Sequence, residues 1–199
     1  MKPARLFSIF LVLAAAPSFA GTLYSVSIDT SSLTAGTTGF IDFTFDGGFP
    51  ATASIYNFSP GAALDSSTLQ TLGTITGTLP GEVDMSNDDS DYFEGISFGS
   101  PISFLLGLSG TPGGTQGDTF TLTFYNADIS GGLLTGNVSD AWLAQWQMDT
   151  AGNITPAAYA NPSGGPSFAS IQLITPEPGS ALLLLAGLAG AMVLRRRIV

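Results

Sequence analysis

The densest group of side chains that could do chemistry is an acidic run from Glu82 to Glu94. Calcium takes about six to eight oxygen ligands and prefers carboxylates and amide oxygens. The run is not an EF-hand, because Tyr92 stands where that loop has glycine and the closing glutamate is out of register. A solvated acidic loop is the plainer interpretation. If the run binds calcium, its candidate ligands are Asp84, Asn87, Asp88, Asp89, Asp91 and Glu94.

The residue types that the chain lacks exclude several mechanisms. It contains no cysteine and no histidine, which excludes a Ser-His-Asp triad, a cysteine nucleophile and an ordinary zinc site. Residues 21–194 also contain no lysine or arginine, so a Schiff base, a P-loop and an arginine clamp are excluded. Only a carboxylate pair, as in a glycosidase, leaves a hydrolase open as an alternative. We predict no catalytic residue and no enzymatic activity.

The charge of the chain is strongly one-sided. Fourteen of the 15 acidic residues lie between Gly21 and Thr175, where no basic residue neutralises them. Such a polyanion cannot bind nucleic acid by neutralising phosphates, so we expect no nucleic-acid partner. It should attract divalent cations and cationic partners, while self-repulsion keeps it soluble. Without cysteine there are no disulfides, and the fold must depend on its core or on bound metal.

Three aromatic residues suggest sugar binding. Trp142, Trp146 and Tyr159 could form a platform on which a sugar ring stacks, and strand alternation would place both tryptophans on one face. Aromatic residues in a β-sandwich more commonly pack in its core, which is the alternative.

These residues must be positioned by strands, because hydrophobic and polar residues alternate with a period of two along most of residues 21–174. Turn sequences rich in glycine and proline separate the segments, and no long stretch has helical periodicity. The pattern predicts an all-β protein with a single antiparallel, jelly-roll-like β-sandwich over residues 21–174. The expected strands lie at 24–28, 41–45, 102–108, 120–124, 142–148 and 169–173, with weaker patterns at 51–58, 69–78 and 92–98.

Both ends of the chain have the features of targeting segments. Residues 1–20 combine a basic start, an apolar stretch and small residues before Ala20, which predicts a signal peptide cleaved between Ala20 and Gly21. Residues 175–199 contain a Pro-Glu-Pro motif, an uncharged stretch at 179–194 and an arginine cluster. This order predicts one transmembrane helix at 179–194, with the arginines in the cytoplasm and residues 21–174 outside. The motif is Pro176, Glu177 and Pro178, and the cluster is Arg195, Arg196 and Arg197.

This three-part order resembles the PEP-CTERM sorting signal of Gram-negative bacteria that make exopolysaccharide, although Thr175 stands where valine is common. The resemblance implies processing by an exosortase, a membrane-embedded cysteine-dependent enzyme, which cleaves near the motif and releases or re-anchors its substrate. The ectodomain also resembles a PEP-CTERM ectodomain family of uncharacterised function, in Gly21–Tyr24, Ile41–Phe45 and Tyr92–Gly99.

We therefore predict an exported, exosortase-processed protein with a structural or adhesive role. It would be anchored transiently in the inner membrane with its ectodomain outside, and then reach the cell surface or the exopolysaccharide matrix. The alternative is a calcium-dependent or carbohydrate-binding matrix module, and a carboxylate-dependent hydrolase comes after it. The expected partners are signal peptidase, exosortase, the membrane before processing, and exopolysaccharide. Calcium is the only cofactor that the sequence suggests.

Overall fold

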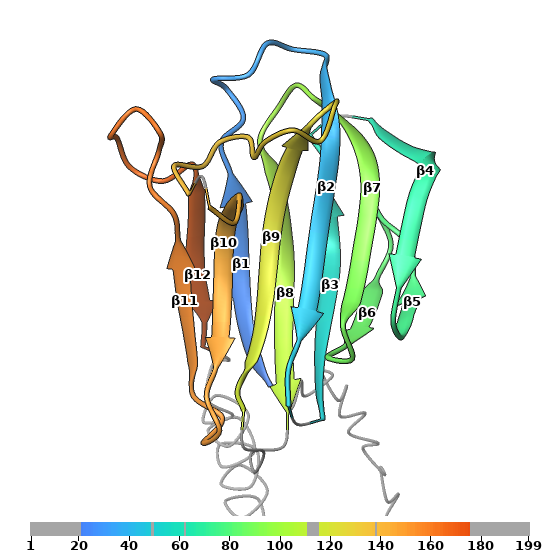
Figure 1. Cartoon of the computed structure of the whole chain (residues 1–199), viewed down its shortest axis with the longest axis vertical. Helices are drawn as coiled ribbons and strands as arrows, with labels where there is room; N and C mark the ends of the chain where they lie inside the picture. Colours follow the sequence, from blue (N-terminus) through green and yellow to red (C-terminus); the bar gives the residue numbers. More distant parts are fainter. Residues whose placement is uncertain (1–20, 49, 62, 111–115, 138, 176–199) are drawn as a thin grey trace, which may run out of the picture.

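The computed structural model describes residues 21–48, 50–61, 63–110, 116–137 and 139–175. Within these ranges the chain is all-β, and two six-stranded antiparallel sheets pack face to face (Figure 1). The predicted β class and the antiparallel two-sheet arrangement are confirmed. The predicted signal peptide at 1–20, the predicted sorting motif, the predicted transmembrane helix at 179–194 and the arginine cluster lie outside the described residues. In the described part of the chain, no helix has the length and apolar character needed to span a membrane.

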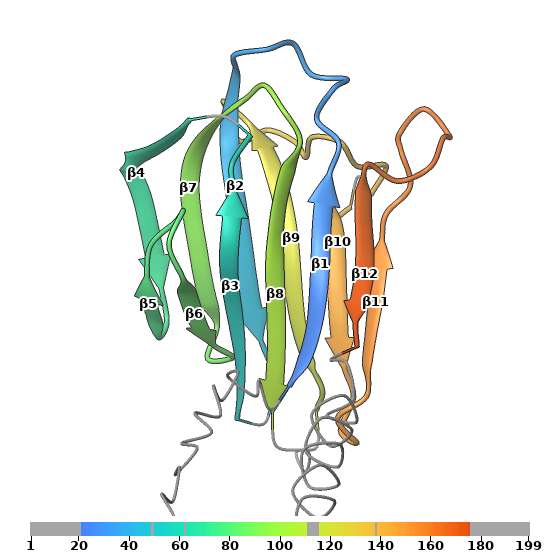
Figure 2. The same cartoon turned by 180° about the vertical axis from the view of Figure 1, so that it is seen from behind.

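The front sheet in Figure 1 has the order β11-β10-β9-β2-β7-β4, and the rear sheet, which Figure 2 shows from behind, has the order β12-β1-β8-β3-β6-β5. The front strands are β11 (Ile154–Ala158), β10 (Trp142–Met148), β9 (Asp118–Asn126), β2 (Thr37–Asp46), β7 (Ser90–Phe98) and β4 (Leu64–Leu72). The rear strands are β12 (Ala169–Ile174), β1 (Thr22–Ile28), β8 (Ile102–Gly110), β3 (Ala51–Ser59), β6 (Val83–Ser86) and β5 (Ile75–Gly77).

The core lies between the two sheets and is rich in aromatic residues. Phe43 on β2 packs edge-on against Phe104 on β8, with ring centroids 5.5 Å apart, and so joins the two layers. Trp146 on β10 is fully buried and contacts Phe120 and Tyr24 at 5.7 and 6.2 Å. Each such side chain contributes about 1.5–3 kcal/mol by leaving water, which explains how the fold is held without disulfides.

The strands predicted from alternation are confirmed, whereas the weaker patterns need correction. The pattern at 69–78 is divided between β4 and β5. Sequence reasoning missed β11, because Pro156 argues against a strand; β11 is an edge strand, where a missing backbone donor is tolerated.

The prediction that Trp142 and Trp146 share one face is also wrong. A β-bulge between Trp142 and Ala144 shifts the register, so that both Leu143 and Ala144 are buried.

The acidic run from Glu82 to Glu94 is not a loop. Val83–Ser86 form β6 of the rear sheet, and Ser90 begins β7 of the front sheet. Only residues 87–89 connect the two strands, and Asp89 has a left-handed backbone with φ 58°. The carboxylates are therefore distributed over two sheets and a tight turn.

Candidate functional site

The six predicted calcium ligands do not come together. On β6, Asp84 accepts a hydrogen bond from the hydroxyl of Ser54. Asn87 accepts one from the backbone of Ala51 at 3.2 Å and donates one to Asp118 at 2.8 Å. Among the described residues, no three acidic side chains form a group that could hold a metal ion.

Asp88 and Asp89 at the turn are used in local interactions. Asp88 accepts hydrogen bonds from the hydroxyl and backbone of Thr74, at 2.6 and 3.1 Å, and from Ser90 at 2.8 Å. These donors lower the pKa of Asp88 to about 2. The pKa of Asp89 is raised, first by a hydrogen bond to the Asp46 carboxyl group. Both side chains are exposed, and they fix the geometry of the turn.

Along β7 the alternation separates the last two predicted ligands. Glu94 points into the core and is only 1% exposed, where it accepts a hydrogen bond of 2.7 Å from the hydroxyl of Tyr92. That hydroxyl in turn accepts a hydrogen bond from the backbone of Leu79 at 2.9 Å. Burial raises the pKa of Glu94. Asp91 points the other way, onto the outer face of the front sheet, and is half-buried.

Asp91 has a partner that sequence reasoning missed. Asp42 on β2 also points outward, and it neighbours Asp91 diagonally because Thr44 pairs with Asp91 and Asp42 pairs with Phe93. Asp42 is 7% exposed, and the Oδ1 atoms of both carboxyl groups are buried with no ordinary donor within reach. The two carboxyl groups are neighbours, and a proton on Asp42 would let it donate a hydrogen bond to Asp91.

The pKa of Asp42 is raised to about 8, first by burial and then by the adjacent Asp91 charge and the shared hydrogen bond. The carboxyl group of Asp42 therefore stays largely protonated at neutral pH. A carboxyl pair in hydrogen-bond contact is closer than the roughly 5–9.5 Å that glycosidases use. A shared proton is also the arrangement of aspartic proteases, so the absence of enzymatic activity stays a prediction.

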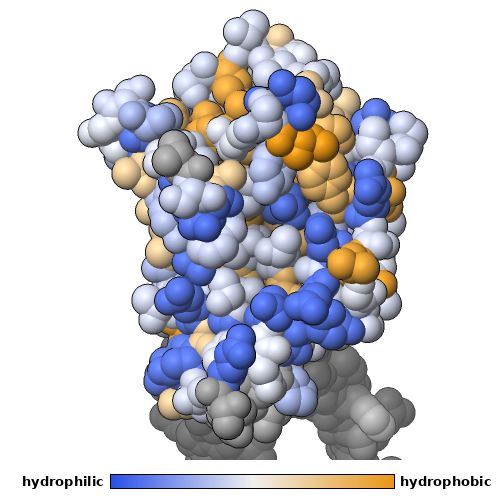
Figure 3. Space-filling view, in the orientation of Figure 1, coloured by the Kyte–Doolittle hydropathy of each residue, from blue (hydrophilic) through white to orange (hydrophobic). Residues whose placement is uncertain are grey.

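The rest of this outer face combines buried hydroxyls with aromatic rings. Thr121 and Thr123 on β9 are buried, and Thr121 is hydrogen-bonded to Thr44 on β2. Phe40 and Phe93 stack with ring centroids 4.6 Å apart at an interplanar angle of 20°, and both are half-buried. In Figure 3, which shows this face, hydrophilic residues occupy the middle and hydrophobic ones gather on the side of β2, β7 and β4.

Two hollows lie over the outer face of β7, and we call them together the β7 groove. The larger measures about 490 Å³, within the range of ligand sites of about 300–1,000 Å³. The smaller measures about 150 Å³ and includes Phe40, Thr68 and Gly95. Gly95 is required at its floor, because a Cβ atom there would lie 2.6 Å from Oγ1 of Thr68. The larger hollow is lined by Gln70, Thr71, Leu72, Asp91, Phe93 and Ile129.

Ile129 is strained at the edge of the groove. It lies between β9 and β10, is 52% exposed, and has a left-handed backbone with φ 58°, which is rare for a β-branched residue. Asn126 holds it there, by accepting a hydrogen bond from the backbone of Ile129 at 3.0 Å and another from that of Ser130 at 2.9 Å. Backbone strain of this kind costs about 1–3 kcal/mol and tends to occur at functional sites.

The predicted aromatic platform is divided. Trp146 belongs to the core, whereas Trp142 is half-buried and faces Tyr159 with ring centroids 6.3 Å apart. The Tyr159 hydroxyl donates a hydrogen bond of 2.9 Å to Gln145, on the outward side of β10. Two of the three residues thus lie on the same outer face as the β7 groove. Sequence reasoning missed the stacked pair Phe40 and Phe93 on this face, although each ring interrupts the polar positions of its strand.

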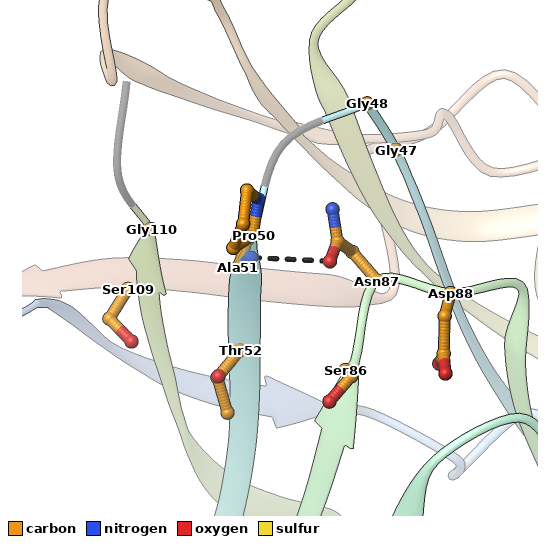
Figure 4. Close-up of a pocket in the computed structure, with 10 residues that line it drawn as sticks. All are labelled: Gly47, Gly48, Pro50, Ala51, Thr52, Ser86, Asn87, Asp88, Ser109 and Gly110. Carbon is orange, nitrogen blue, oxygen red and sulfur yellow. Dashed lines mark hydrogen bonds between the residues drawn. The ribbon is translucent and has the colours of Figure 1, made fainter. Parts of the chain in front are cut away.

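A larger hollow of about 750 Å³ lies at one end of the sandwich and is separate from the β7 groove. It is lined by residues at the ends of β2, β3, β6 and β8 (Figure 4). Among the described residues, Asn87, Asp88 and small residues line it, without an aromatic ring. Because this lining offers no aromatic surface to a ligand, we base no function on it.

No protein-family model, no curated protein and no solved structure matches the chain.

Proposed function

We propose that this is an exported protein of the cell surface or exopolysaccharide matrix, with a structural or adhesive role, and that it adheres by binding polysaccharide along the β7 groove. The observation that carries the proposal is the stacked pair Phe40 and Phe93, which lies half-exposed beside hydrogen-bonding groups on the outer face of the front sheet. Ligand sites typically combine such aromatic surface with a few well-placed polar groups.

For the fold we propose the jelly-roll form of the β-sandwich. It is supported by the nested pairing of β1 with β8, β2 with β7 and β3 with β6, as when a long hairpin folds over on itself. In this description β9 to β12 are additions that widen both sheets. β5 is paired with β6, and not with β4. The additions β9 and β10 extend the outer face that carries the groove.

For the route to the surface we propose the signal peptide, the single transmembrane helix and exosortase processing implied by the PEP-CTERM resemblance. The composition of the ectodomain is compatible with this location. Its fold does not depend on disulfide formation, and repulsion between its acidic side chains keeps it soluble. We retain calcium only as a weaker candidate, since no group of three acidic ligands forms among the described residues.

The direct test is binding of the protein, purified from its native cell, to the exopolysaccharide of the same cell. We expect the variant Phe93→Ala to bind more weakly by about threefold to tenfold, the equivalent of about 0.5–1.5 kcal/mol for one aromatic contact. The matched control is Leu173→Ala, which removes a side chain that is 57% exposed on β12 of the other sheet. Equal binding by both variants and the native protein, with unchanged melting temperatures, would overturn the groove as the binding site.

A further inference from the structure

No basic side chain of residues 21–194 can neutralise the carboxyl groups of the β7 groove. This part of the chain contains no lysine, arginine or histidine, so Asp91 has no cationic partner within it. Asp42 is buried beneath the surface, whereas Asp91 is half-buried and lines the larger hollow. The charge therefore faces the groove at Asp91.

The spacing along β7 combines this charge with an aromatic surface. Asp91 and Phe93 are two residues apart on the same side of the strand, a step of roughly 6.6 Å. A single pyranose ring can span that step, with its face on Phe93 and a substituent at Asp91. Gln70 from β4 borders the same hollow and offers both a donor and an acceptor to hydroxyl groups. Leu72 and Ile129 supply its apolar sides.

Charge selects among the polysaccharides that such a groove could accept. Uronic acids and sulfated sugars would approach a surface with 14 acidic residues and no basic one, which repels them. A neutral sugar would leave the Asp91 carboxylate without an ionic partner. A protonated amino group brings three N–H donors and a positive charge, and hydrogen bonds between such groups and a carboxylate are about twice as strong as neutral ones.

We propose that the β7 groove binds a polysaccharide of amino sugars with free, protonated amino groups, in which the ammonium group of one sugar pairs with Asp91 and its ring stacks on Phe93. This inference rests on the proposed polysaccharide binding and adds the chemical class of the ligand. Asp42 acts as a positioning residue, because it is the diagonal neighbour of Asp91 and its buried carboxyl group can donate a hydrogen bond to it.

The test compares glucosamine oligomers with fully N-acetylated oligomers of the same length, by calorimetry with the purified protein. The measurements are made at about pH 6, below the pKa of roughly 7.7–8.0 of a peptide α-amino group, so that the sugar amino groups are protonated. We expect the native protein to prefer the glucosamine oligomer by at least about tenfold. Asp91→Asn should abolish this preference, and Asp91→Glu, which keeps the charge, should restore most of it.

The control Asp29→Asn removes one exposed carboxylate in the connection after β1 and should leave the preference unchanged. If Asp29→Asn lowers the preference as much as Asp91→Asn does, general charge attraction explains it and the inference is wrong. Equal binding of the two oligomers by the native protein would also overturn it, while leaving the proposed polysaccharide binding intact. If neither these oligomers nor the native exopolysaccharide binds, the proposed function itself fails.

Discussion

Asp42 and Asp91 illustrate how position on a sheet changes the chemistry of a carboxyl group. The chain contains 15 acidic residues, but these two meet only because β2 and β7 are neighbours in a particular register. The surrounding residues of the outer face bury Asp42, and this burial raises the pKa of its carboxyl group. A one-residue shift of either strand would turn one carboxyl group toward the core and separate the pair.

The pair predicts that the protein loses stability as the pH rises from about 5 to about 8. An aspartic acid in the unfolded chain loses its proton near its ordinary pKa of 3.8, whereas native Asp42 keeps it until about pH 8. Unfolding therefore releases a proton in this window, so raising the pH favours the unfolded state, by on the order of a few kcal/mol in total. Denaturant titrations across the window measure the decline in the free energy of unfolding.

Asp42→Asn should reduce that decline, because an amide donates to Asp91 at every pH. Part of the decline should remain, since burial also raises the pKa of Glu94. Asp29→Asn serves as the control, because the pKa of Asp29 is lowered and its stabilising effect disappears only at acidic pH. A pH dependence that is identical in Asp42→Asn and the native protein would show that the shared proton is not the cause.

The hydroxyl group of Tyr92, which is hydrogen-bonded to the buried Glu94, should contribute measurably to stability. We expect Tyr92→Phe to destabilise the protein by about 1–3 kcal/mol, because removal of the hydroxyl leaves both buried partners, Glu94 and the backbone of Leu79, without their hydrogen bonds. Tyr159→Phe, which removes one hydrogen bond at a half-buried site, should cost less than about 1 kcal/mol. Similar losses in the two variants, measured by denaturant unfolding, would contradict this account.

At the scale of elements, most strands are predictable from residue types because each buries one face. Alternation such as Ile41-Asp42-Phe43-Thr44-Phe45 specifies which side chains enter the core without any knowledge of neighbours. β6 has the same alternation in Val83 and Met85, but its acidic surroundings resembled a metal loop.

The candidate site could not be predicted in the same way. It depends on which strands are neighbours and in what register, and residues 49 positions apart, such as Asp42 and Asp91, carry no local signal of their pairing. The bulge at Trp142 is likewise a product of tertiary packing. Only the outward aromatic residues Phe40 and Phe93 gave a local indication, because a solvent-facing position seldom requires a ring.

The connection between β9 and β10 predicts a conflict between stability and binding. Ile129→Gly should leave stability equal or slightly higher, because glycine adopts a left-handed backbone without strain, and it should weaken oligosaccharide binding by removing one apolar side of the β7 groove. Leu134 is the matched control, since it has φ 61° in the same connection but is only 6% exposed. Leu134→Gly should lower the melting temperature through lost core packing. A fall in melting temperature for Ile129→Gly as large as for Leu134→Gly would contradict the interpretation of Ile129 as strained.

At the scale of the whole molecule, the sandwich is complete between the two expected processing sites. All strands of the described residues lie between Thr22 and Ile174, and β12 pairs along its whole length with Leu23–Ile28 of β1. Cleavage after Ala20 and near residues 176–178 would therefore remove no strand. We expect processing to change the location of the protein while the sandwich keeps its melting temperature.

This arrangement permits a direct test of the sorting motif. Replacing Pro176, Glu177 and Pro178 by alanine should leave an exported protein that retains its arginine cluster and stays in the membrane, because the enzyme that reads the motif no longer cleaves it. Mass spectrometry of the protein from its native cell should then find a start at Gly21 in both proteins, but an intact Arg195–Arg197 only in the variant. The same replacement should leave oligosaccharide binding unchanged, since the β7 groove lies on strands that are distant from the motif in the sequence. If the variant is trimmed and released like the native protein, the motif is not the signal, and the adhesive role would need another route to the surface.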